Sequence, residues 1–98
     1  MGNSLKSAHF LIESRVRDAA RGDAQACYDL GIVYSSGADG VDIDLIEAHK
    51  WFNIAAMSGS EHAQECRAEI AEDMTAREII AAQKAARDWL GLTQRRAA

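Results

Sequence analysis

The sequence predicts an all-α protein of about five helices. The chain of 98 residues contains no proline, a residue that breaks the interior of a helix. It is also rich in alanine, which has the highest helix propensity. Apolar residues recur three or four positions apart, which is the spacing of one helical face. We expect helices at residues 4–21, 23–35, 45–58, 61–73 and 76–90.

The first predicted helix has one apolar stripe, made by Leu5, Ala8, Ile12, Val16 and Ala19. Such a stripe faces the core in a surface helix. Phe10 lies nearly opposite the stripe on a helical wheel, and Leu11 also lies outside it. Two interpretations of Phe10 are open: an exposed or loop-packed side chain, or a contact with a partner or a second subunit.

Residues 23–58 predict a hairpin of two helices joined by a glycine turn. Asp23 is the expected N-cap of the first helix, because its carboxylate can accept from free backbone N–H groups. Gly37 and Gly40 mark the turn, where we expect positive φ angles. Asp44 precedes the second helix and matches a capping box with Glu47.

Two residues of the hairpin carry specific packing expectations. Trp51 lies on the inner stripe of the second helix with Phe52 and Ala55, and we expect it to anchor the core. Gly31 lies inside a helix, where glycine costs about 1 kcal/mol relative to alanine. We therefore expect a neighbouring helix to leave no room for a side chain at Gly31.

Capping signals also delimit the last two helices. Gly59 ends the hairpin, and Ser60 is the expected N-cap of the helix that follows. Thr75 and Glu78 form a second capping box at the start of the last helix. We expect Gly91 to end that helix and residues 93–98 to form a frayed polar tail.

A weak internal repeat leads to a family resemblance. The motif A-A-x-G at residues 19–22 returns as A-A-x-x-G at residues 55–59, and the two glycines lie 37 positions apart. The segment 19–59 resembles one full Sel-one-like repeat (SLR), a relative of the tetratricopeptide repeat, through A-x-G-D-A-Q-A-x-Y-D-L-G-x-x-Y-x-x-G, G-V-x-x-D and E-A-x-K-W-F-x-x-A-A-x-x-G. Residues 63–89 are similar to the closing segment of many bacterial SLR proteins.

The resemblance implies a right-handed α–α superhelix made of one and a half SLR units and a terminal capping helix. It also implies a protein-interaction scaffold. By analogy with tetratricopeptide repeats, the concave face of the first hairpin helix would carry Gln25, Tyr28, Ile32 and Ser35. A shift of 37 positions maps these residues to His62, Glu65, Glu69 and Glu72.

Composition limits the classes of partner. The chain is 48% hydrophobic and 27% charged, which is typical of a soluble globular domain. Its formal net charge of −4 argues against nucleic acid, because binding to phosphates needs a basic face. No run of about 18 apolar residues or secretory signal is present, so we expect no membrane association. We interpret Cys27 and Cys66 as small apolar residues in a reducing cytoplasm, and we expect a single cytoplasmic domain.

Few residues suggest chemistry. His62 and Cys66 lie four positions apart on one predicted helix, a spacing that can chelate a metal, but no further pair completes a zinc site. The same helix has an acidic face, formed by Glu61, Glu65, Glu69, Glu72 and Asp73. A general acid–base pair would need a partly dry site, so we interpret this face as solvated. We expect no metal, no cofactor and no enzyme activity.

The favoured function is a bacterial adaptor that holds a peptide or a protein helix, in signalling or regulation. Two alternatives are a small hydrolase-like SLR protein and a regulatory subunit of a DNA-binding protein or a kinase. Phe10 and Leu11 lie outside the main stripe and leave apolar surface on the N-terminal helix. We therefore also predict a two-fold homodimer that buries this surface, since such dimers are the commonest oligomers. A partner helix that covers the same patch is the competing prediction.

Overall fold

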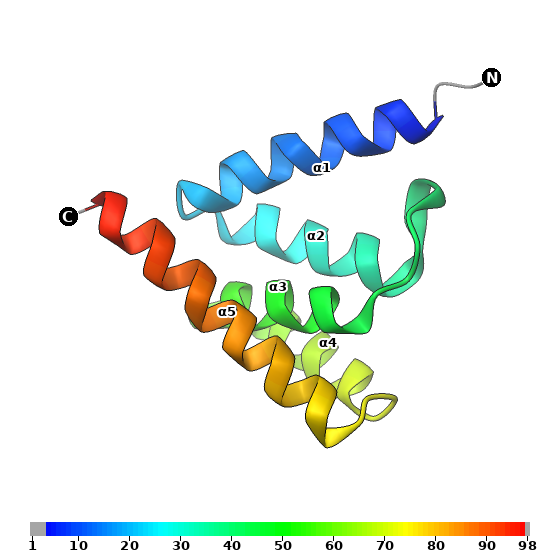
Figure 1. Cartoon of the computed structure of the whole chain (residues 1–98), viewed down its shortest axis with the longest axis vertical. Helices are drawn as coiled ribbons and strands as arrows, with labels where there is room; N and C mark the ends of the chain where they lie inside the picture. Colours follow the sequence, from blue (N-terminus) through cyan, green and yellow to red (C-terminus); the bar gives the residue numbers. More distant parts are fainter. Residues whose placement is uncertain (1–3, 98) are drawn as a thin grey trace.

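The computed structural model describes residues 4–97, and it describes the side chains of residues 8–93. This part of the chain contains five α-helices, one short 3₁₀ turn and no strand. They are α1 (Ser4–Ala20), α2 (Ala24–Ser36), η1 (Ala38–Gly40), α3 (Leu45–Met57), α4 (Glu61–Ala71) and α5 (Ala76–Ala97) (Figure 1). The all-α prediction is confirmed.

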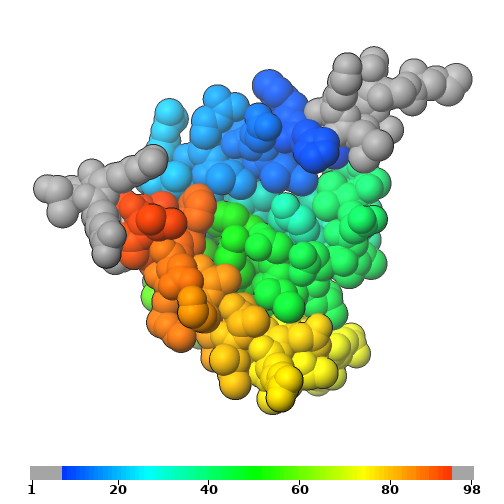
Figure 2. All heavy atoms as spheres, viewed as in Figure 1, coloured from blue at the N-terminus to red at the C-terminus, as the bar shows by residue number. Residues whose placement is uncertain are grey.

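The central helix is α3. It packs against α2, α4 and α5, whereas α1 packs against α2 and η1. In Figure 1, α1, α2 and α3 follow one another down the molecule and α5 slants across α3. Figure 2 shows α1 and α5 covering different ends, with residues of α3 visible between them. The largest fully buried side chains are those of Phe52 on α3 and of Leu30 and Cys27 on α2, so the core is centred between these two helices.

The predicted caps explain where the helices begin. Asp23, Asp44 and Ser60 occupy the N-cap positions of α2, α3 and α4, and each side chain accepts from a backbone N–H of the first turn. Thr75 and Glu78 make both hydrogen bonds of a capping box. The Glu78 N–H donates to the Thr75 hydroxyl oxygen at 3.2 Å, and the Thr75 N–H donates to the Glu78 carboxylate at 2.8 Å.

The predicted capping box at Asp44 is only half formed. Asp44 accepts from the Glu47 N–H at 3.1 Å, but its own N–H donates to the Tyr34 carbonyl oxygen at 2.9 Å. The Glu47 carboxylate instead accepts from the Trp51 indole N–H at 3.1 Å and from the Lys50 ammonium at 3.2 Å. The Glu47 side chain therefore holds the Trp51 side chain in place and does not accept from the Asp44 N–H, as a capping box would require.

The turn between α2 and α3 contains the predicted positive φ angles, 72° at Gly37 and 79° at Gly40. Glycine enters this region easily because it has no Cβ. Asp39 also has a positive φ, of 58°. Among the described residues it is the only non-glycine residue with a positive φ. Short polar side chains such as aspartate tolerate this conformation better than most residues.

The prediction that Gly91 ends the last helix is wrong. α5 continues to Ala97, so the frayed tail expected over residues 93–98 is helical up to Ala97, and Ala98 lies outside the described residues. Trp89, Leu90 and Thr93 line a cavity of about 270 Å³ together with the turn between α1 and α2. Trp89 and Leu90 pack against the core before Gly91, and the Thr93 hydroxyl after it donates to their carbonyl oxygens, so the helix is held on both sides of this glycine.

Candidate protein-binding surface

The four predicted concave residues of α2 lie on one face of this helix. We call Gln25, Tyr28, Ile32 and Ser35 the open face, because all four keep contact with solvent. The core-facing residues of the same helix are Ala26, Cys27, Leu30 and Gly31. The open face is bordered by α1, which shares a groove with it, and by α4, which contacts Tyr28.

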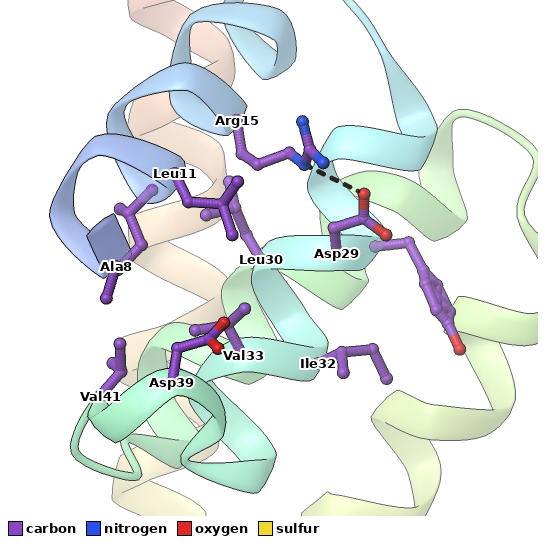
Figure 3. A pocket seen from close by; sticks show the side chains of 11 residues that line it. Ala8, Leu11, Arg15, Asp29, Leu30, Ile32, Val33, Asp39 and Val41 are labelled. Carbon is purple, nitrogen blue, oxygen red and sulfur yellow. Dashed lines mark ion pairs between the residues drawn. The ribbon is translucent and has the colours of Figure 1, made fainter. Parts of the chain in front are cut away.

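The groove has a volume of about 500 Å³ and lies between α1 and α2 (Figure 3). Its apolar lining includes Leu11 and Ile12 from α1, Ile32 and Val33 from α2, and Val41 from the turn. Leu11 and Ile32 are 39% and 37% exposed, although both are large apolar residues. A concave apolar surface of this kind suits the side chains of a partner.

One ion pair lies in the groove and joins its two helices. The Arg15 Nε lies 3.2 Å from the Asp29 carboxylate, as the dashed line in Figure 3 marks. The Gln25 side-chain amide donates to the same carboxylate at 2.9 Å. Asp39 also lines the groove, and it forms no ion pair with the side chains that the structure describes. The charge that the groove retains is therefore negative.

Tyr28 connects the groove to α4. Its ring stacks on the imidazole of His62, with centroids 5.3 Å apart and planes 13° apart, and its edge packs on Phe52. Burial and the contact with Cys66 on α4 raise the pKa of the Tyr28 phenol. The His62 Nδ1 lies 3.5 Å from the Glu65 carboxylate. The surface is thus continuous from the groove across Tyr28 to the acidic face of α4.

The acidic face of α4 is fully solvated, as predicted. Glu61, Glu65 and Glu69 lie on α4, and all three are exposed. The helix predicted to residue 73 ends at Ala71, so Glu72 and Asp73 are exposed in the turn that follows. Glu65 has His62 as its neighbour, and the other members form no ion pair within the described residues. Exposed carboxylates of this kind offer charge to a partner but no dry site for acid–base chemistry.

Most of the predicted binding residues lie on this surface, and Phe10 and Leu11 differ in their place on α1. Leu11 lines the groove, whereas Phe10 is 68% exposed and is not among the residues that line it. Phe10 follows Ala8 by two positions, about 200° around the helix, and Ala8 faces the groove. Leu11 therefore belongs to the groove and Phe10 does not, and the two-fold dimer through this helix stays a prediction.

Sequence reasoning missed Arg15, Asp29 and Val41, which complete the groove. Arg15 follows Leu11 by four positions, so helical spacing offered a signal that it shares a face with Leu11. Val41 follows the glycine turn and is half buried. No sequence rule links the turn after α2 to the first helix, because that contact is purely tertiary.

Other groups show little sign of reactivity. Burial raises the pKa of the Cys27 thiol to about 11, which is the opposite of what a nucleophilic thiolate needs. Cys66 is half buried beside Tyr28. Across the described residues, no group of three or more histidine, cysteine or carboxylate side chains is placed to hold a metal ion.

His49 is a buried histidine between α3 and α4. It is 4% exposed, and its Nδ1 has no hydrogen-bond partner among the described residues. Arg67 of α4 lies nearby and donates to the side-chain oxygen of Asn53, one turn further along α3. Burial, and then the positive charge of Arg67, lower the pKa of His49.

Acid is therefore expected to destabilise the fold through His49. An unfolded histidine binds a proton near pH 6.5, so below about this pH the unfolded chain binds more protons than the folded one. The free energy of unfolding should fall by up to about 1.4 kcal/mol per pH unit until the lowered pKa of His49 is reached. Urea unfolding between about pH 7.5 and pH 5.5 measures this slope.

His49→Gln should flatten this slope, whereas His9→Gln, at an exposed position, should leave it unchanged. An equal slope in the parent and in His49→Gln would contradict the assignment.

Comparisons with protein families, with characterised proteins and with solved structures find no match for this chain. None of the helices in residues 4–97 has both the length and the apolar character needed to cross a bilayer.

Proposed function

We propose that this chain is a non-enzymatic adaptor that binds a peptide or a protein helix on the open face of α2. The observation that supports this most directly is the groove of about 500 Å³, in which Leu11 and Ile32 remain exposed. Monomeric proteins rarely leave large apolar side chains together in a solvent-open hollow without a use for them. The groove adjoins Tyr28, an aromatic residue of the type enriched in protein interfaces.

The SLR-type superhelix is part of the same proposal. Its support is the hairpin of α2 and α3, with caps at Asp23 and Asp44 and with Gly31 beneath Phe52. In such a superhelix, successive first helices line a concave face. The contact between Tyr28 on α2 and His62 on α4 is consistent with that arrangement.

Selection of peptides tests the proposal. The probe is a displayed library of random peptides of about 16 residues, long enough for about four helical turns. Peptides enriched on the whole chain should bind at least tenfold more weakly to Ile32→Asp, because a charge would enter an apolar contact. The matched control is Ile80→Asp on α5, an apolar residue that is 62% exposed and lies outside the groove.

Binding to the control should remain within about twofold of the parent. The proposal fails if no peptide is enriched. It also fails if Ile32→Asp and Ile80→Asp behave alike.

A further inference from the structure

The charges around the groove are distributed unevenly. Within the groove, Arg15 and Asp29 neutralise each other at 3.2 Å, and Asp39 remains. Beyond Tyr28, Glu65 and Glu69 follow each other by one helical turn on α4, and both are exposed. The only described lysine or arginine of α4 is Arg67, which is bonded to Asn53 at the interface with α3. A ligand that lies across this surface therefore meets an apolar strip beside an acidic strip.

We propose that the natural occupant of the groove is a basic amphipathic helix, an inference that rests on the proposed adaptor function. Its apolar side chains would contact Leu11, Tyr28 and Ile32, and its lysine or arginine side chains would lie over Glu65 and Glu69. Both carboxylates are exposed, so a lysine or arginine of the partner can approach them while it stays hydrated. The opposite charges then attract each other. Rim charges of this kind speed association and select the partner more than they add affinity.

The shape of the surface favours a helix over an extended peptide. Extended peptides usually gain affinity by adding a strand to a sheet edge, and residues 4–97 contain no strand. Here helices form both sides of the groove, with Leu11 and Arg15 one turn apart on α1 and Tyr28 and Ile32 one turn apart on α2. Apolar side chains at three- and four-residue spacing on a partner helix match this ridge pattern.

Charge also argues against a second copy of the chain as the occupant. In a two-fold dimer the same surface meets itself. Such a dimer would bring the acidic faces of two α4 helices toward each other, on chains that each carry a formal net charge of −4. Juxtaposed like charges disfavour that arrangement.

The selected peptides and two charge-reversed variants test the inference. Enriched peptides should carry lysine or arginine on one helical side and apolar residues on the other. For the most enriched peptide, fluorescence anisotropy should show about tenfold weaker binding to Glu65→Lys combined with Glu69→Lys, since each exposed ion pair contributes up to about 1 kcal/mol. Binding should also weaken as salt rises from about 50 mM to about 0.5 M in the parent but not in this variant.

The matched control is Glu13→Lys combined with Asp88→Lys, which changes the net charge equally at exposed positions on α1 and α5. It should bind within about threefold of the parent. A peptide with its lysines changed to glutamate should regain affinity for the Glu65→Lys, Glu69→Lys variant, an outcome that general loss of folding cannot produce.

Three other outcomes would overturn the inference, and each can be told apart from the rest. Selected peptides that are neutral or acidic and that lose binding in Ile32→Asp would reject a basic partner while leaving the adaptor function intact. Peptides insensitive to Ile32→Asp would reject the adaptor function itself. A dimer in light scattering that Ile32→Asp dissolves would show that a second copy occupies the groove.

Discussion

Replacing Trp51 with alanine is expected to lower the free energy of unfolding by about 3–5 kcal/mol. Trp51 is 2% exposed at the centre of α3. Its ring packs edge-to-face on Trp89 of α5, with centroids 4.9 Å apart, and the Lys50 ammonium lies 4.4 Å from its ring centroid. Its indole N–H also donates to Glu47. Truncation would remove all of these contacts and leave a cavity between α3 and α5.

Urea unfolding followed by circular dichroism measures this loss. The matched control is Leu92→Ala, because Leu92 is a large apolar residue of α5 that is 64% exposed. We expect a change below about 0.5 kcal/mol for the control. Trp51→Phe keeps most of the side-chain volume, so its free energy of unfolding should fall less than that of Trp51→Ala. This second variant keeps the prediction testable if Trp51→Ala does not fold. A loss under about 1 kcal/mol for Trp51→Ala would contradict the role of a core anchor.

Much of the secondary structure was predictable because its signals are local. Asp23, Ser60 and the pair of Thr75 and Glu78 cap their helices within three residues of their own position. A side chain that reaches only the nearest backbone N–H groups can be read from the sequence without knowledge of the fold. The glycine turn at residues 37–40 was predictable for the same reason.

The helix end and the capping box that were predicted wrongly have different causes. Gly91 looked like a helix end, yet Trp89 and Leu90 pack against the core and the helix continues. Glu47 matched a capping box, yet Trp51 offered its carboxylate a hydrogen-bond donor on the same helix. At Gly91 tertiary packing outweighs a local preference worth only about 1 kcal/mol, whereas at Glu47 one local contact within α3 replaces another.

The candidate surface was partly predictable. The analogy with tetratricopeptide repeats placed Gln25, Tyr28 and Ile32 on one face of α2, and all three keep contact with solvent on that helix. Spacing gave no information on the angle at which α1 meets α2, and that angle brings Leu11 into the groove while Phe10 points elsewhere. A helical wheel describes one helix, so it cannot distinguish a groove from a flat exposed patch.

Gly31→Leu is expected to destabilise the fold by roughly 3 kcal/mol or more, although leucine has the better helix propensity. A Cβ at Gly31 would overlap the Phe52 ring carbons Cδ1 and Cε1 and would lie 2.9 Å from Cγ. Phe52 is itself 1% exposed and cannot move into solvent. Even Gly31→Ala should lower the melting temperature, because the overlap begins at Cβ.

Gly91 provides the matched control, since it also lies inside a helix and a Cβ there would meet nothing within 4 Å. Gly91→Ala should therefore stabilise the protein by up to about 1 kcal/mol, the propensity difference alone. Combining Gly31→Ala with Phe52→Leu should recover part of the stability lost at Gly31, because the smaller side chain removes the overlap. Thermal unfolding of the single and double variants measures this coupling. A Gly31→Leu protein that melts above the parent would place Gly31 on a free surface and remove the close contact between α2 and α3.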